Sequence, residues 1–171
     1  MDEFPGHVKE ALEEIRGVFP FLFAGHGFRV VLVEEAGAPH CLIGLRSNVC
    51  QFKFEYHAGI PEISVGRLTA RMRWGAASGE VEWFSIHKVI VLLSEESGRV
   101  LKDATETPPE IAALAPQEQI LALYGSQKIG DQIAAISRVM EPLMEDILSL
   151  FASEASPGRW EAFLKAYHDS P

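Results

Sequence analysis

The hydrophobic period of the chain changes twice, and these changes restrict the folds open to it. Near the N-terminus, apolar side chains recur every three or four residues, at Val8, Leu12, Ile15 and Phe19, which is the spacing of one helix face. From residue 28 the period becomes two, which is typical of strands. Between residues 129 and 151 the helical spacing returns. We therefore predict an α+β fold with an N-terminal helix, an antiparallel meander sheet of four or five strands, and a helical C-terminal half packed on the sheet.

Four strands are expected between residues 28 and 74. The turn signals at 36–39 and at Ser47-Asn48 predict tight reversals that pair Glu35 with His40 and Ile43 with Phe52. This register gives the sheet an apolar inner face made of Phe28, Val30, Leu32, Cys41, Ile43, Leu45, Cys50, Phe52, Phe54 and Tyr56. The last strand runs from Ile63 to about Trp74 and needs a bulge near Gly66 to keep its apolar side chains inward.

The opposite, outer face of this sheet is less polar than a solvated surface. It collects Val31, Val33, Leu42, Gly44, Arg46, Val49, Gln51, Lys53 and Glu55. Either the C-terminal helices cover this face or a second copy of the chain does, forming a homodimer. Coverage within the chain is the favoured interpretation.

The C-terminal half has one ambiguous segment. Residues 83–93 are almost wholly apolar and fit either a buried helix or a buried strand; the helix is preferred. Residues 94–109 are the most linker-like part of the chain. Pro142 should kink the helical run around it, and a short final helix carries Trp160, Phe163 and Tyr167 on one side. The 171 residues are expected to form a single domain, with the sheet region at about 28–74 and the helical region at about 81–168.

Charge limits the classes of partner. The chain carries 15 basic and 24 acidic residues, a net charge of −9, which repels nucleic acids. The longest charge-free stretch with apolar character, residues 18–28, is too short to span a membrane, and the acidic start Met1-Asp2-Glu3 does not resemble a signal peptide. A cytoplasmic protein that binds neither nucleic acid nor membranes is expected.

One group of residues could bind a metal ion. The predicted register places Glu35, His40 and Glu55 in one row on the outer face, with His57 diagonal to His40. Two imidazoles and two carboxylates in such a patch could hold a divalent metal or exchange protons. The competing interpretation is a charged rim that discourages strand pairing at the sheet edge.

A second group is basic. Arg67, Arg71 and Arg73, together with Arg46 and Lys53, could form a stripe that binds an anion or a partner. The competing interpretation is that these side chains pair with carboxylates of the same molecule.

No catalytic or cofactor-binding motif accompanies these residues, so no cofactor is expected. The two cysteines, Cys41 and Cys50, lie too far apart in the predicted register for a disulfide and are expected to be free thiols in the core. The leading hypothesis is a non-catalytic binding or accessory protein, such as an inhibitor or immunity protein for a basic partner. The alternatives are a small metal-binding protein or enzyme that uses the His/Glu group, and a protein that binds a small ligand between the sheet and the C-terminal helices.

Overall fold

A computed structural model describes residues 4–57, 60–74, 82–105, 111, 113, 118, 128–152 and 155–170 of the chain. The strands are β1 (Arg29–Glu35), β2 (Cys41–Arg46), β3 (Cys50–His57), β4 (Ile60–Arg67) and β5 (Trp83–Ser85). The helices are α1 (Gly6–Val18), α2 (Pro20–Ala24), α3 (Ile86–Leu93), α4 (Glu95–Thr105), α7 (Lys128–Met140), α8 (Met144–Phe151) and α9 (Pro157–Asp169), with a 3-10 turn η1 (Glu141–Leu143) between α7 and α8.

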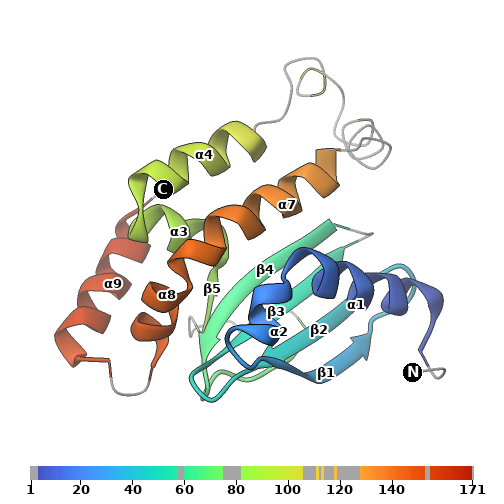
Figure 1. The fold of residues 1–171 in the computed structure, drawn as a ribbon, viewed down its shortest axis with the longest axis horizontal. Coiled ribbons are helices and arrows are strands. Elements are labelled where there is room, and N and C mark those ends of the chain that lie inside the picture. The colour runs from blue at the N-terminus through green and yellow to red at the C-terminus, as the bar shows by residue number, and fades with distance from the viewer. Residues whose placement is uncertain are drawn as a thin grey trace.

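The five strands form one antiparallel sheet in the order β1-β2-β3-β4-β5. Helices α1 and α2 lie across one face of this sheet, and the C-terminal helices gather beyond its β4 and β5 side (Figure 1). The predicted α+β architecture is confirmed. Among the described residues, none of the helices combines the length and apolar character that a membrane crossing requires.

The face of the sheet under α1 carries the hydrophobic core. Val8, Leu12 and Ile15 are buried on α1 at helical spacing, and they join Phe52 and Phe54 of β3 in one cluster that also contains buried residues of α7 and α8. Such burial stabilises by about 1.5–3 kcal/mol for each large apolar side chain. The helical half is thus packed on the same core as the sheet.

The β2–β3 turn is longer than predicted. Gln51, rather than Val49, pairs with Arg46, and Phe54, rather than Phe52, pairs with Ile43. The cause is Ser47, whose buried hydroxyl accepts hydrogen bonds from the backbone N–H groups of Val49 and Cys50 and thereby extends the turn. A shift of two residues keeps every side chain on its face, so the predicted inner residues of β2 and β3 are all buried.

The predicted β1–β2 register is wrong by one residue, and this error assigns side chains of β1 to the wrong face of the sheet. Glu35 pairs with Cys41 instead of His40, and a bulge between Val30 and Leu32 restores the register toward the start of β1. Because neighbouring residues of a strand point to opposite sides, Leu32 lies on the outer face while Val33 and Glu35 lie on the α1 side.

Strand β4 ends at Arg67, well before the predicted limit near Trp74. The following segment, residues 68–74, turns back over the outer face. Gln51 donates hydrogen bonds from its side-chain amide to the carbonyls of Arg67 and Ala70, at 3.0 and 2.9 Å. At Gly44 an added Cβ would lie 2.9 Å from the Met72 side chain, so the 68–74 segment packs directly on β2.

The outer face is therefore covered partly by the chain itself, as favoured, but by this segment and not by the C-terminal helices. The predicted alternation of the segment persists, since Ala70 is buried while Arg71 and Arg73 are exposed. The 68–74 segment prevents a second copy of the chain from packing on the part of the outer face that it covers.

The ambiguous residues 83–93 form both candidate structures, a short strand β5 followed by helix α3. The stretch expected to be a linker is instead largely helical, because α4 occupies most of it; its end, at residues 106–109, lies outside the described residues. Pro142 falls in the 3-10 turn η1, which interrupts the helical run as predicted.

An aromatic cluster joins β5 to the C-terminal helix. The Phe84 ring has its centroid 5.6 Å from that of Phe151, 5.5 Å from that of Trp160 and 5.2 Å from that of Phe163. Tyr167 completes the group at 5.0 Å and also accepts, through its hydroxyl, a hydrogen bond from the backbone N–H of Ser85.

Replacing Phe84 with alanine is expected to lower the free energy of unfolding by about 3–5 kcal/mol, because the loss of a fully buried ring leaves a cavity among four aromatic side chains of α8 and α9. Urea denaturation followed by circular dichroism measures this change. The exposed Val91 is the control, and V91A should stay within about 0.5 kcal/mol of the parent. Equal losses in the two variants would contradict the assigned core.

Candidate functional site

A pocket of about 410 Å³ opens between α1 and the ends of strands β2 and β3 near the β1–β2 turn. We call it the α1 pocket. One wall is a stripe of α1 that flanks its buried face, and the other is formed by the turn and the sheet. Its lining residues are His7, Glu10, Ala11, Glu14, Pro39, Cys41 and Tyr56. A volume of this size suits a small molecule or one side chain of a partner.

A row of three side chains crosses the sheet at this pocket. Glu35 pairs with Cys41, and Cys41 pairs with Tyr56, so all three lie on the α1 side. The Tyr56 hydroxyl donates a hydrogen bond of 2.9 Å to Oε2 of Glu14. On the opposite side of the row, Nε2 of His7 lies 3.9 Å from Oε1 of Glu35. The pocket therefore joins α1 to three strands through polar contacts.

Burial raises the pKa values of two side chains in this row, the Cys41 thiol and the Tyr56 hydroxyl. Desolvation, assisted by the charge of Glu35, raises the pKa of the Cys41 thiol to about 11. Desolvation, the charge of Glu14 and the hydrogen bond to Glu14 all raise the pKa of Tyr56. Both groups are therefore protonated at neutral pH, and a protonated thiol is a poor nucleophile.

The remaining charges give the α1 pocket a negative potential. Three carboxylates, those of Glu10, Glu14 and Glu35, lie on or beside its walls, and among the described residues that line the pocket His7 is the one basic side chain. Glu14 is half-buried whereas Glu10 and Glu35 are exposed, and a half-buried carboxylate attracts cations more strongly than an exposed one does. The arrangement is suited to binding a cationic group and provides no activated nucleophile.

The predicted His/Glu group does not assemble on one face. His40 and His57 are neighbours on the outer side, with ring centroids 6.1 Å apart, and Trp74 lies 5.1 Å from His57. Glu55 shares this face, but Glu35 points to the α1 side because of the one-residue register error. Within the described parts of the chain, no three side chains of histidine, cysteine, aspartate or glutamate come together as a metal site.

The predicted basic stripe is also divided. Lys53 is buried, and Arg67 lies on the α1 side of the sheet with its guanidinium 3.8 Å from the centroid of the Trp160 ring. Arg46 donates a hydrogen bond to the carbonyl of Leu68, and Arg71 and Arg73 are exposed on the 68–74 segment. Anion binding by these last three arginines stays a prediction.

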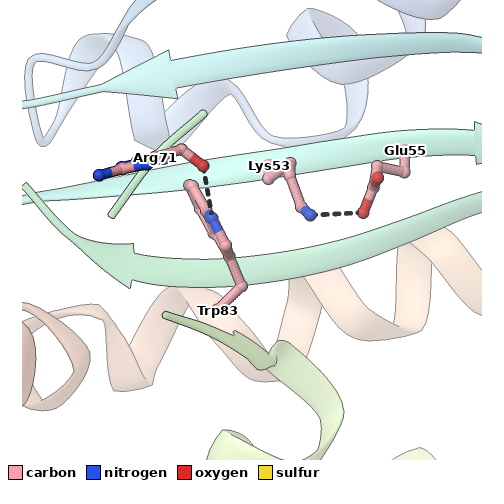
Figure 2. Close-up of polar contacts among 4 residues, drawn as sticks. All are labelled: Lys53, Glu55, Arg71 and Trp83. Carbon is pink, nitrogen blue, oxygen red and sulfur yellow. Dashed lines mark hydrogen bonds and ion pairs between the residues drawn. The ribbon is translucent and has the colours of Figure 1, made fainter. Parts of the chain in front are cut away.

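Lys53 and Glu55 form a buried ion pair on the outer face (Figure 2). Nζ of Lys53 lies 2.7 Å from Oε2 of Glu55, and the two residues are 2% and 5% exposed. Lys53 also lies 5.2 Å from the centroid of the Trp83 ring, and Trp83 donates a hydrogen bond from Nε1 to the carbonyl of Arg71. The pair is thus part of the contact between the central strand, β5 and the 68–74 segment.

A second cavity, of about 330 Å³, lies between β4 and α7. We call it the β4–α7 cavity; its lining includes His57, Glu62, Ile63, His87 and Ile136. Burial lowers the pKa of His87, so this imidazole is neutral at pH 7. The cavity occupies the place where the sequence suggested a small-ligand site, between the sheet and the C-terminal helices.

Comparisons with known protein families, with curated proteins and with solved structures find no match for this chain. The candidate site therefore rests on geometry alone. Sequence reasoning missed the α1 pocket, although one signal was present: His7, Glu10 and Glu14 repeat at helical spacing beside the buried stripe of α1. Placing Cys41 and Glu35 opposite them required the true register of β1.

Removing one member of the Lys53–Glu55 pair is expected to cost about 3–5 kcal/mol of unfolding free energy, because the other charge stays buried without its partner. K53M and E55L should each show this loss in urea denaturation. The double variant K53M/E55L should recover most of it, since neither charge is then buried. A double variant that loses the sum of both single losses would contradict the pairing.

Stability should fall as the pH rises above about 9. The thiol pKa values are raised by burial from 9.0 to about 11 for Cys41 and to about 12 for Cys50. In this range the unfolded chain releases protons that the folded chain retains, so the free energy of the unfolded state falls relative to that of the folded state and the free energy of unfolding decreases. Urea denaturation at about pH 8 and about pH 10 measures the decrease. C50A should show a smaller decrease than the parent, and a flat pH profile would contradict the assignment.

Proposed function

We propose that this protein is a non-catalytic binding protein whose partner is a basic protein, acting as an inhibitor or immunity protein would act on a basic target. The observation that carries the proposal is the α1 pocket, a cavity of about 410 Å³ whose lining includes the carboxylates of Glu10 and Glu14, with Glu35 beside the His7 of that lining. A cavity walled by carboxylates selects cationic groups, and basic proteins present such groups on their surfaces.

The charge of the whole chain supports the same partner. With a net charge of −9, the molecule attracts basic proteins over distances beyond direct contact and raises their rate of association. The long-range field of the molecule and the carboxylates of the pocket thus both favour a positively charged partner.

The state of the pocket's reactive groups supports binding over catalysis. Burial raises the pKa of both Cys41 and Tyr56, and the Glu14 carboxylate that accepts the Tyr56 hydrogen bond raises the pKa of that hydroxyl further, so both groups are protonated at neutral pH. Cys41 and Cys50 are free, buried thiols, which fits a reducing compartment such as the cytoplasm.

A second candidate function, small-ligand binding, is favoured by the β4–α7 cavity. Its walls combine the apolar Ile63 and Ile136 with the neutral imidazole of His87, a mixture that is common in ligand pockets. A thermal-shift screen against metabolites separates this candidate from the first, because its hits should be sensitive to I136W and not to changes in the α1 pocket.

The proposed function predicts a retained partner with a high isoelectric point. The immobilised protein is exposed to native cell extract at about 50 mM and about 300 mM salt, where screening differs strongly. A basic protein should be retained at the lower salt and largely released at the higher salt. The purified partner should then bind the wild-type chain directly in calorimetry.

The control is a double variant that removes the same amount of negative charge as E10Q/E14Q, but at positions away from the α1 pocket. E10Q/E14Q should weaken binding of the purified partner by at least about tenfold, in line with the loss of charge-assisted hydrogen bonds. E141Q/D146N removes the same charge from exposed positions of η1 and α8 and should change it by less than about threefold. Retention of neutral or acidic proteins only, or of none, would refute the proposed function.

A further inference from the structure

We propose that the α1 pocket receives a single arginine side chain of the basic partner. The inference rests on the proposed function and assigns the group that the pocket recognises. It is carried by two features of the pocket: the carboxylates and other acceptors at its walls, and its mixed polar and apolar lining.

Two carboxylates line the pocket and a third lies beside it. Glu10 and Glu14 are one helical turn apart on α1, so their side chains project from the same face. Glu35, at the end of β1, lies beside His7 of the lining, with its Oε1 3.9 Å from Nε2 of that histidine. A guanidinium between these walls can donate hydrogen bonds in several directions at once, which a planar group with five N–H donors does better than a compact ammonium.

The polar atoms of the pocket present acceptors to a ligand. The hydroxyl of Tyr56 already donates its hydrogen to Oε2 of Glu14, which fixes that carboxylate and leaves its further lone pairs for another donor. Nε2 of His7 is buried and has no hydrogen-bond partner, and the Glu35 carboxylate at 3.9 Å is too far to supply one. Buried polar atoms seldom stay unpaired, so this wall is incomplete without a further polar group.

The remaining lining suits the stem of an arginine. Ala11 and Pro39 are small apolar surfaces at the pocket, and the aliphatic part of an arginine side chain packs on such surfaces while its charged end stays among polar groups. Arginine is also more weakly hydrated than lysine, so its transfer into a partly enclosed cavity costs less free energy. The pocket therefore distinguishes the two basic side chains.

Titration of the ¹⁵N-labelled full chain with N-acetyl-arginine amide tests the inference. The amide resonances of Ala11, Cys41 and Tyr56 should shift together and saturate with a dissociation constant on the order of 1 mM, as expected for so small a ligand. N-acetyl-citrulline amide has the same shape without the charge and should leave these resonances in place. N-acetyl-lysine amide should bind about threefold or more weakly.

The matched variants lie on the same helix. E14Q should weaken binding of the arginine amide by about tenfold. E13Q removes the same charge from the neighbouring exposed position, outside the pocket lining, and should change binding by less than about twofold. E10Q, at an exposed residue, replaces E14Q as the reporter should the latter variant fail to fold.

Several results would overturn the inference. Equal shifts with the citrulline amide, scattered shifts outside the pocket, or equal effects of E13Q and E14Q would each show that the pocket does not recognise a guanidinium. If the purified basic partner binds E14Q and E10Q as tightly as wild type, the inference fails while the proposed function stands. If the arginine amide binds the pocket but no basic protein is retained, the proposed function fails, and with it the assignment of this arginine to a partner protein.

Discussion

Strand β3 is buried on both of its faces, and the rest of the structure follows from the need to cover it. Residues Cys50–Tyr56 are all buried, although Gln51, Lys53 and Glu55 alternate with apolar side chains along the strand. On the α1 side, coverage by helices is ordinary apolar packing. On the outer side, a lysine and a glutamate can be buried only because they neutralise one another at 2.7 Å. The 68–74 segment and Trp83 complete that side, so the central strand organises both layers.

Much of this architecture could be predicted from the sequence. The two changes of hydrophobic period located α1, the four long strands and the α7–α8 run, and the inner residues of β2 and β3 were identified because a register error of two residues preserves faces. The 68–74 segment was not recognised as a separate element, since its alternating pattern fits an extended strand equally well. The ladder ends at Arg67 because its partner Cys50 is the first residue of β3. The Gln51 side chain then holds the following segment through hydrogen bonds to two carbonyls, and such long-range contacts leave no local signal.

The candidate site was less predictable than the fold because the predicted β1–β2 register was wrong by one residue, and an error of one residue moves a side chain to the other face of the sheet. The proposed His/Glu row required Glu35 and His40 to be opposite one another, whereas Glu35 points toward α1 and contributes to the pocket's negative potential. His40 and His57 remain neighbours, because both lie on strand positions of the same parity. The metal hypothesis therefore lost one carboxylate to the opposite face of the sheet, where Glu35 lies beside His7 of the α1 pocket lining.

The five residues that connect Glu35 to Cys41 determine which side of the sheet receives that acid, while the bulge at Val31 returns Val30 and Phe28 to the core. These two irregularities compensate each other. Loss of a single residue from this connection would swing Glu35 to the other side and leave the apolar framework of β2 and β3 unaltered.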